Sequence, residues 1–283
     1  MDPKYKLTLE EGDTNLEAFR DLFLKREDKN PTGSLKDRGM AYQISQIYSE
    51  GKKNLVISSS GNAAISAAAY CRLAGFKLYA FISPKTNRGK LEKLQKLGAE
   101  IIVSSKAVSQ AARFAKEKNY VNLRPSISEF GPEGYQTIAY ELMKENFEDI
   151  FIPVSSGTAL TGIARGFLKF GFLPRIHLCQ SAAVCPLGSL FDKDFIKENF
   201  SPAKALVAKF SPLKKEIVKY IKDSGGSGWV IESEEVIKID KDLQKNNIET
   251  SEEGALALAA VYKAREKGFN LGKTVVLLTG KKY

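Results

Sequence analysis

Residues 54–75 read NLVISSSGNAAISAAAYCRLAG, and this stretch carries the pattern that decides the fold class. It begins with a short β-branched run at 54–58, passes through a Ser/Gly turn and continues as an Ala-rich segment that ends at Gly75. β-branched residues favour strands, alanine favours helices, and glycine commonly ends a helix. The stretch therefore predicts one strand–turn–helix unit of an α/β protein.

The same rhythm continues along most of the chain. Further strands are expected at 77–82, 100–103, 121–123, 149–154, 175–179 and 273–278, and helices at 36–48, 61–74, 87–97, 107–116, 134–144, 158–170, 213–222, 234–244 and 252–267. Alternation of this kind predicts mostly parallel sheets covered by helices. The pattern restarts after residue 131, so we expect two lobes: a smaller one at 40–131, and a larger one formed by 1–39 together with 132–283.

Composition removes several classes of function. The chain has 283 residues and a formal net charge of +10, from 43 Lys plus Arg and 33 Asp plus Glu. The densest basic cluster, 204–222, alternates with apolar residues at helical spacing, which is typical of a solvated amphipathic helix rather than a nucleic-acid surface. The single histidine, His177, excludes multi-histidine metal sites, and a Ser-His-Asp site would have to be built around it. We expect neither a metal nor a nucleic-acid partner.

The sequence also indicates a cellular environment. Its apolar runs are too short to span a bilayer, and no apolar leader follows Met1. The three cysteines, Cys71, Cys179 and Cys185, form no CxxC pair and are odd in number, which favours reduced thiols. We therefore expect a cytoplasmic protein without a membrane partner.

Residues 30–39 read NPTGSLKDRG and place a lysine at a helix start. The turn delivers Lys36 into the first turn of the helix expected at 36–48. The positive end of a helix disfavours an ammonium ion, and desolvation would lower the lysine pKa further, making the amine a better nucleophile towards an aldehyde. The alternative is a solvent-facing lysine, and these physical arguments alone favour that alternative.

The stretch 58–62, SSSGN, is a second turn that runs from strand into helix. Its free N–H groups could hold a carboxylate, and Asn62 adds an amide near the helix start. Ordinary N-capping by Ser60 or Asn62 explains the turn equally well.

Two further turns lie nearer the C-terminus. Residues 153–162, PVSSGTALTG, combine small residues with a helix start, where backbone N–H groups can approach a phosphate. They lack the GxxxxGK[ST] and GxGxxG patterns, so a cofactor phosphate is favoured over a nucleoside triphosphate.

Residues 275–280, VVLLTG, form a buried strand that ends in the hydroxyl of Thr279. The alternative there is a threonine that satisfies a nearby backbone group.

In this order, the four turns resemble the motifs of the fold-type II pyridoxal-phosphate (PLP) enzymes, the tryptophan synthase β-like family. The motifs are the lysine segment 24–38, SSGN at 59–62, the small-residue loop 155–159 and LTG at 278–280. Within this family the threonine synthases are the most similar, through NLRP at 122–125, EGYQT at 133–137 and segments at 174–187 and 224–226. The resemblance runs from residue 11 to residue 280 and implies a two-lobed α/β fold, with a mobile smaller lobe and a larger lobe that binds PLP.

The resemblance also implies a role for each motif. Lys36 would form the Schiff base with PLP and then act as general acid and base. Asn62 would hydrogen-bond the phenolic oxygen of PLP, and Thr279 would face its pyridine nitrogen. The cofactor phosphate would be cradled by Ser155, Ser156, Gly157, Thr158 and Ala159. The substrate carboxylate would be held by Ser59, Ser60 and Gly61.

The activity implied is that of a carbon–oxygen lyase of threonine biosynthesis, which converts O-phosphohomoserine and water to threonine and phosphate. Such a substrate needs a second anion pocket, for which Arg124 is the first candidate and Ser34 and Lys85 are weaker ones. A salt bridge between the lobes is the alternative role of Arg124.

The sequence departs from this pattern at the substrate loops. Ala63 stands where many threonine synthases have Thr, and a few extra residues lie between 125 and 133. Two other readings therefore stay open. One is a serine/threonine dehydratase or a cysteine-synthase-like β-replacement enzyme of the same fold. The other is a degenerate family member that acts as a binding or regulatory protein. The family analogy also predicts a homodimer and a small amino-acid substrate.

Overall fold

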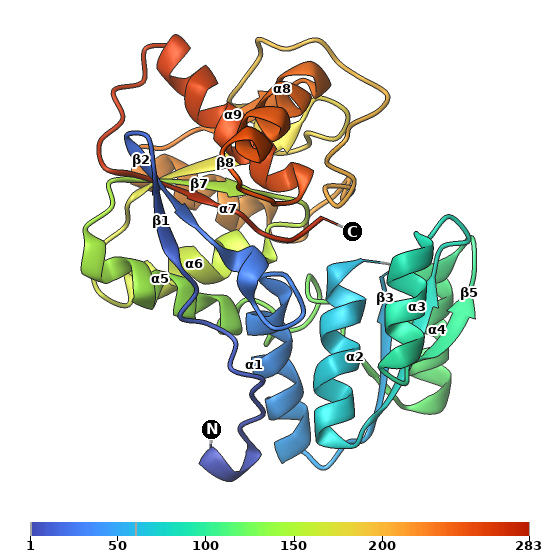
Figure 1. Ribbon diagram of the computed structural model, residues 1–283. Helices are drawn as coiled ribbons and strands as arrows, with labels where there is room; N and C mark the ends of the chain where they lie inside the picture. The colour runs from blue at the N-terminus through green and yellow to red at the C-terminus, as the bar shows by residue number, and fades with distance from the viewer. Residues whose placement is uncertain (1, 60, 283) are drawn as a thin grey trace. The chain divides into compact units, whose positions relative to one another are not determined.

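The chain folds into two compact units, which this computed structural model describes over residues 2–59 and 61–282 (Figure 1). The first unit contains the residues up to Glu11 and Asn30–Gly134, and the second contains Gly12–Lys29 and Tyr135–Lys282. The sequence-based division placed 1–39 with the larger lobe, whereas 30–39 packs within the first unit. The physical reason is that the helix beginning at Lys36 packs against the helix beginning at Asn62.

The first unit is a parallel four-stranded sheet in the order β5-β4-β3-β6. Its strands are β3 (Asn54–Ser58), β4 (Lys77–Ile82), β5 (Glu100–Val103) and β6 (Val121–Asn122), and its helices are α1 (Lys36–Ser49), α2 (Asn62–Ala74), α3 (Arg88–Lys96) and α4 (Ala107–Lys118). Alternate residues of β3 face opposite sides of the sheet. Leu55 and Ile57 pack with α1, α2 and α3, while Val56 packs with α4. Both faces of the sheet are therefore buried, as parallel sheets require.

The second unit is a six-stranded sheet in the order β1-β2-β10-β7-β8-β9. Its strands are β1 (Leu16–Phe19), β2 (Leu22–Lys25), β7 (Asp149–Pro153), β8 (Arg175–Ser181), β9 (Gly228–Ile231) and β10 (Thr274–Leu277). Among the described strands of this sheet, β1 and β2 pair antiparallel and the other neighbours pair in parallel. Within this unit, α8 (Ser233–Lys245) and α9 (Glu252–Glu266) lie on one side of the sheet, and α5 (Gln136–Leu142), α6 (Thr158–Leu168) and α7 (Lys214–Ser224) lie on the other (Figure 1).

The expected fold class, an α/β protein with mostly parallel sheets, is confirmed. Three strands were not expected: the hairpin of β1 and β2, and the short edge strand β9. The hairpin turns at Arg20, which adopts a left-handed φ of 57° without being Gly or Asn. Because the Asn-Gly or Asp-Gly pair typical of such turns is missing, the local sequence does not predict this turn.

The single histidine belongs to a buried network of the second unit. Trp229 Nε1 donates to His177 Nδ1 at 3.0 Å, so Nε2 carries the ring proton and donates to Asp149 Oδ1 at 3.0 Å. Arg175 donates twice to the same carboxylate, at 2.7 and 2.6 Å. Burial lowers the pKa of His177. Burial alone would raise the pKa of Asp149, but the hydrogen bonds from His177 and Arg175 hold it at about 2. His177 therefore has a structural role here.

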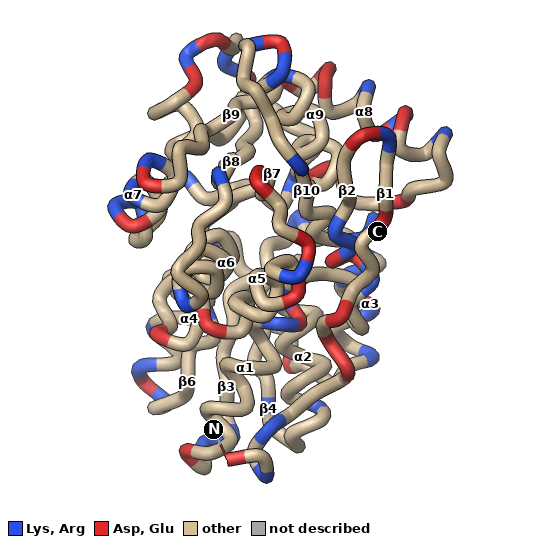
Figure 2. The backbone as a smooth tube through the Cα atoms, turned by 90° about the vertical axis from the view of Figure 1, so that its left-hand side faces the viewer, with Lys and Arg blue, Asp and Glu red and all other residues tan. Residues whose placement is uncertain are grey.

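Basic and acidic residues are interspersed along the backbone of both units (Figure 2). Pairs one helical turn apart, such as Arg88–Glu92, Arg113–Glu117 and Lys219–Asp223, are solvent-exposed. Within the described part of the chain, no helix is both long and apolar enough to cross a membrane. The same residues contain no group of three or more His, Cys, Asp or Glu that could hold a metal ion.

Candidate active site

The turn before α1 is locked by a carboxylate that follows the lysine. Asp37 is fully buried, and its two oxygens accept hydrogen bonds from Thr32 N at 2.7 Å and Thr32 Oγ1 at 2.6 Å. Gly33 completes the turn with a left-handed φ of 95°, and its N–H donates to Asn30 O at 2.8 Å. These contacts make Lys36 the first residue of α1.

The ammonium group of Lys36 is desolvated. Burial lowers its pKa from the ordinary lysine value to about 8, although part of the side chain stays accessible. Its position at a helix N-terminus disfavours the charged form in the same direction. A larger share of neutral, nucleophilic amine is therefore present near neutral pH than for a solvent-facing lysine.

Asn62 begins α2 directly after the Ser/Gly turn. Helix α1 leads into β3 through residues 50–53, and α2 leaves β3 through residues 59–61, so both helices run antiparallel to β3. Because the two helices also pack side by side, α1 and α2 both begin at the end of the first unit where β3 ends (Figure 1). Lys36 and Asn62 are the first residues of these helices. The amide oxygen of Asn62 is buried and has no hydrogen-bond partner among residues 2–59 and 61–282.

The turn before α2 is held by Ser59, whose Oγ accepts a hydrogen bond from Gly61 N at 3.2 Å. Gly61 is the N-cap of α2 and offers no side-chain capping bond, so the first N–H groups of the helix depend on other acceptors. Ser60, the third predicted carboxylate ligand, lies outside the described residues.

The loop from Ser155 to Ala159 joins β7 to α6 in the second unit. Gly157 has a left-handed φ of 89°, and a Cβ atom there would lie 2.0 Å from Ile217 Cδ1. Ser156 Oγ and Thr158 Oγ1 are hydrogen-bonded at 3.1 Å. The N–H groups at the start of α6 lack intrahelical acceptors, which makes the loop suitable for an anion.

A distant segment fixes this loop. Ala208 N donates to Ser155 Oγ at 3.2 Å, and Ser211 Oγ donates to Ser156 O at 2.6 Å. Sequence analysis missed both supporting residues, because the only local signal is an irregular stretch between β8 and α7. It also missed Asp37 and Thr32, although a Thr and an Asp flanking the lysine turn are typical turn-stabilising residues.

Thr279 follows β10 and is held by its neighbours. Leu278 N donates to Lys25 O at 3.0 Å, and Leu278 O accepts from Asp28 N at 2.9 Å. Strand β10 pairs in parallel with β7, so Thr279 and the loop after β7 lie beyond the carboxyl ends of adjacent strands. That edge is where open α/β sheets place their ligands.

The three residues suggested for a second anion pocket have different surroundings. Arg124 and Lys85 are exposed, and their backbone N–H groups are used locally, by Asn122 Oδ1 and Ser83 Oγ. Ser34 is buried, and its Oγ accepts from Lys36 N at 3.4 Å. Its hydroxyl therefore already supports the lysine turn.

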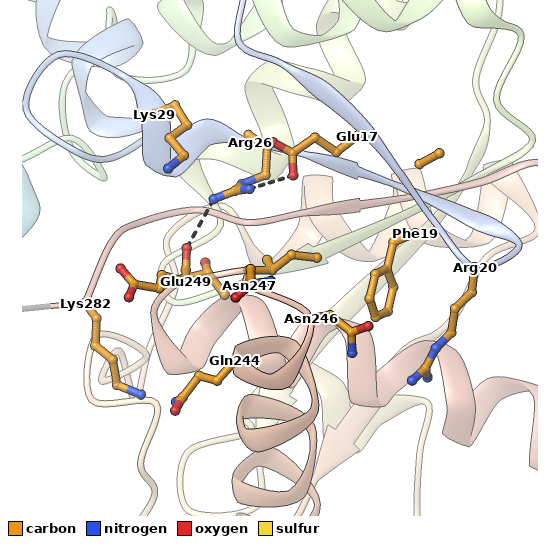
Figure 3. Close-up of a pocket in the computed structure, with 13 residues that line it drawn as sticks. Glu17, Phe19, Arg20, Arg26, Lys29, Gln244, Asn246, Asn247, Glu249 and Lys282 are labelled. Carbon is orange, nitrogen blue, oxygen red and sulfur yellow. Dashed lines mark hydrogen bonds and ion pairs between the residues drawn. The ribbon is translucent and has the colours of Figure 1, made fainter.

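A separate groove of about 1360 Å³ lies in the second unit (Figure 3). None of the predicted site residues that the structure describes lines it. Arg26 is committed within the protein, since its guanidinium pairs with Glu17 at 2.6 Å and donates to Glu249 O at 3.2 Å (Figure 3). The groove is therefore distinct from the residues that the motifs identify.

Comparisons with known proteins agree with the motifs. Residues 7–280 match the family described as pyridoxal-phosphate dependent enzyme. The chain is 31% identical over 276 residues to the threonine synthase of Bacillus sp. (strain ULM1), covering 92% of this chain and 77% of that protein. It is 27% identical over 277 residues to the catabolic L-threonine dehydratase of Staphylococcus aureus (strain USA300), covering 92% and 78%.

Solved structures show the same fold. The structure of maize serine racemase superposes with a TM-score of 0.83 at 21% identity, covering 95% of this chain and 88% of that one. Threonine deaminase isoform 2 from Solanum lycopersicum superposes with a TM-score of 0.81 at 17% identity, covering 99% and 82%. The fold is thus that of the fold-type II PLP enzymes. The family match over nearly the whole length shows that this chain belongs to the pyridoxal-phosphate dependent enzymes, with PLP as its cofactor.

Proposed function

We propose that this protein is a PLP-dependent carbon–oxygen lyase, and that its reaction is that of a threonine synthase: O-phosphohomoserine and water give threonine and phosphate. The observation that carries the catalytic part is the desolvated Lys36, with a pKa of about 8, at the start of α1, while the neighbouring helix α2 begins with the buried amide of Asn62. The similarity to threonine synthases over 92% of the chain supports the substrate.

The residues present fit PLP. Among the described residues, the buried amide oxygen of Asn62 has no hydrogen-bond donor, so it could accept from a phenolic O–H of the ring. Turning the amide over would instead place its N–H2 group to donate to an ionised phenolic oxygen. The loop after β7 offers helix-start N–H groups and two hydroxyls for the phosphate. Thr279 would present a neutral hydroxyl to the pyridine nitrogen, and Lys36 would bind the aldehyde.

The proposed roles of PLP and of the protein residues follow from the chemistry of these groups. PLP, when bound, supplies an electron sink for negative charge at the substrate Cα. Lys36 Nζ would take the Cα proton and move protons at Cβ, for which a pKa near the working pH is well suited. The turn at Ser59 and Gly61, together with Ser60, would hold the substrate carboxylate at the start of α2. A neutral hydroxyl at the ring nitrogen favours elimination and replacement chemistry over reactions that need a protonated ring.

The substrate phosphate needs its own cation in this scheme. Arg124 is our first candidate because its side chain is exposed, and Lys85 is the second for the same reason. Ser34 is the weakest, since its hydroxyl already accepts from Lys36 N. Phosphate would leave from Cγ, and water would add at Cβ.

The test is to incubate the PLP-loaded protein with O-phosphohomoserine and to measure threonine and inorganic phosphate. Equal amounts of both products are expected. A protein that binds PLP and releases neither product contradicts the proposal. Arg124→Ala should raise KM for the phosphorylated substrate and leave that for serine unchanged, whereas Arg113→Ala, at another exposed arginine, should change neither.

A second candidate is a serine/threonine dehydratase, which the 27% identical relative from Staphylococcus aureus supports. It needs no second phosphate site, and its products from threonine would be 2-oxobutanoate and ammonia. A β-replacement enzyme would instead require an added nucleophile. Incubation with serine or threonine, with and without sulfide, separates these reactions.

A binding or regulatory protein without catalysis is disfavoured by the intact Lys36 and Asn62. Borohydride reduction should fix the cofactor on Lys36, and a colourless protein that takes up no PLP would support the non-catalytic alternative.

We also propose a homodimer, which light scattering coupled to size-exclusion chromatography would reveal as twice the chain mass of 31.2 kDa.

A further inference from the structure

The start of α9 holds a serine hydroxyl that the fold does not use. Ser251 is the N-cap of this helix, where a serine normally accepts a hydrogen bond from the first-turn N–H groups. Here its side chain makes no capping bond. Its Oγ is buried in a residue that is only 6% exposed, and it has no hydrogen-bond partner within the described ranges. Buried hydroxyls are rarely left in this state unless another group completes them.

The backbone places Ser251 next to the end of β10. Ser251 N donates to Gly280 O at 2.7 Å, and Thr250 Oγ1 donates to the same oxygen at 3.1 Å. Gly280 directly follows Thr279. In the first turn of α9, a Cβ at Gly254 would lie 3.0 Å from Leu278 Cδ2, so the helix start also packs against the residue before Thr279.

The carboxylates of this first turn are engaged elsewhere. Glu253 Oε1 accepts from Ala205 N at 2.8 Å, and Glu252 pairs with Lys282 at 3.5 Å. The backbone therefore brings two residues with neutral hydroxyls, Ser251 and Thr279, close to the positive end of a helix of 15 residues. This environment suits an uncharged hydrogen-bond acceptor better than a cation.

We propose that Ser251 is a second binding residue for the pyridine-nitrogen edge of PLP, acting beside Thr279 and keeping the ring nitrogen unprotonated. The inference rests on the proposed role of Thr279. It adds a ligand from a segment that no motif of the sequence identified, and it gives the unused hydroxyl of Ser251 a partner.

The experiment compares the affinity of the apoprotein for PLP and for 1-deaza-PLP, in which a CH group replaces the ring nitrogen. Ser251→Ala should weaken PLP binding about tenfold, the effect of one lost hydrogen bond, and change deaza-PLP binding less than twofold. Ser251→Thr should restore PLP binding. Ser233→Ala removes the first serine of α8, whose hydroxyl binds Glu198, and should leave the ratio of the two affinities unchanged.

Thermal unfolding of the apoprotein separates a binding role from a structural one. Because the Ser251 hydroxyl has no hydrogen-bond partner among residues 2–59 and 61–282, Ser251→Ala should not lower the apoprotein Tm. Equal loss of affinity for both cofactors, no loss for either, or a lower apoprotein Tm would overturn the proposal. A wild-type protein that binds PLP but forms no product from any amino acid contradicts the proposed reaction, and the affinity ratio still decides the role of Ser251.

Discussion

The two units hold their motif residues in different ways. In the first unit, the candidate groups are side chains at the starts of α1 and α2: an amine whose pKa is lowered to about 8 and a buried amide. In the second unit, the backbone after β7 and β10 is fixed by hydrogen bonds from distant segments, such as Ser211 to Ser156 O. The comparison teaches that burial sets the properties of the candidate residues in the first unit, whereas long-range hydrogen bonds fix the backbone of the candidate loops in the second.

The largest effect is expected from removing the amine of the first unit. Lys36→Ala should reduce the rate of product formation by about 1,000-fold or more, because one group serves as both cofactor link and general acid–base. Initial rates would measure this, and borohydride should then fix no cofactor on the chain. Lys52→Ala, at an exposed lysine beyond α1, is the control. Full activity in the Lys36 variant would refute the assignment.

The next effect tests the backbone anchor of the second unit. Gly157→Ala should weaken PLP binding roughly tenfold or more, because the left-handed φ of 89° and the clash with Ile217 force the loop to move, at about 1–3 kcal/mol. Gly171 also has a left-handed φ, 69°, but open space around it, so Gly171→Ala is the matched control. If Gly157→Ala and Gly171→Ala weaken PLP binding equally, then the strain of a left-handed alanine, and not the position of the loop after β7, determines the affinity for PLP.

A pH titration tests the desolvated lysine directly. Because burial lowers the pKa of Lys36 to about 8, the neutral amine that captures PLP should increase as pH rises through about 8. An ordinary lysine would reach the same point near pH 10.4. The rate of PLP capture by the apoprotein, corrected with Lys36→Ala, measures this midpoint. A midpoint above pH 10 would mean that the amine is solvated in the apoprotein.

The smallest effect on bound PLP is expected from a substitution in the buried hydrogen-bond network of His177 in the second unit. His177→Gln should lower the free energy of unfolding by about 1–3 kcal/mol, because Asp149 and Trp229 each lose a buried hydrogen-bond partner of fixed geometry. Urea unfolding measures the loss. The absorption spectrum of bound PLP should be unchanged, and a shifted spectrum would contradict a purely structural role for His177.

Much of this protein follows from local sequence patterns. The β-branched run at 54–58, the Ala-rich helix after Gly61 and the small-residue loop at 155–159 all adopt the expected elements. Lys36 and Asn62 are the first residues of their helices. The turns before them predicted a lysine in the first turn of one helix and an amide near the start of the other. These features were predictable because strand propensity, helix starts and glycine turns depend on neighbours along the chain.

Tertiary structure alone decided the rest. Four features depend on residues distant in sequence. They are the hairpin at Arg20, the packing of 30–39 into the first unit, the hydrogen bonds from Ala208 and Ser211 to the loop after β7, and the unused hydroxyl of Ser251. The lowered pKa of Lys36 has the same origin, since desolvation requires surrounding atoms that only the folded chain brings near. The sequence by itself determined which groups could react and where most of the helices and strands lie. Burial and long-range hydrogen bonds determined which of those groups are desolvated, held in place or left for a ligand.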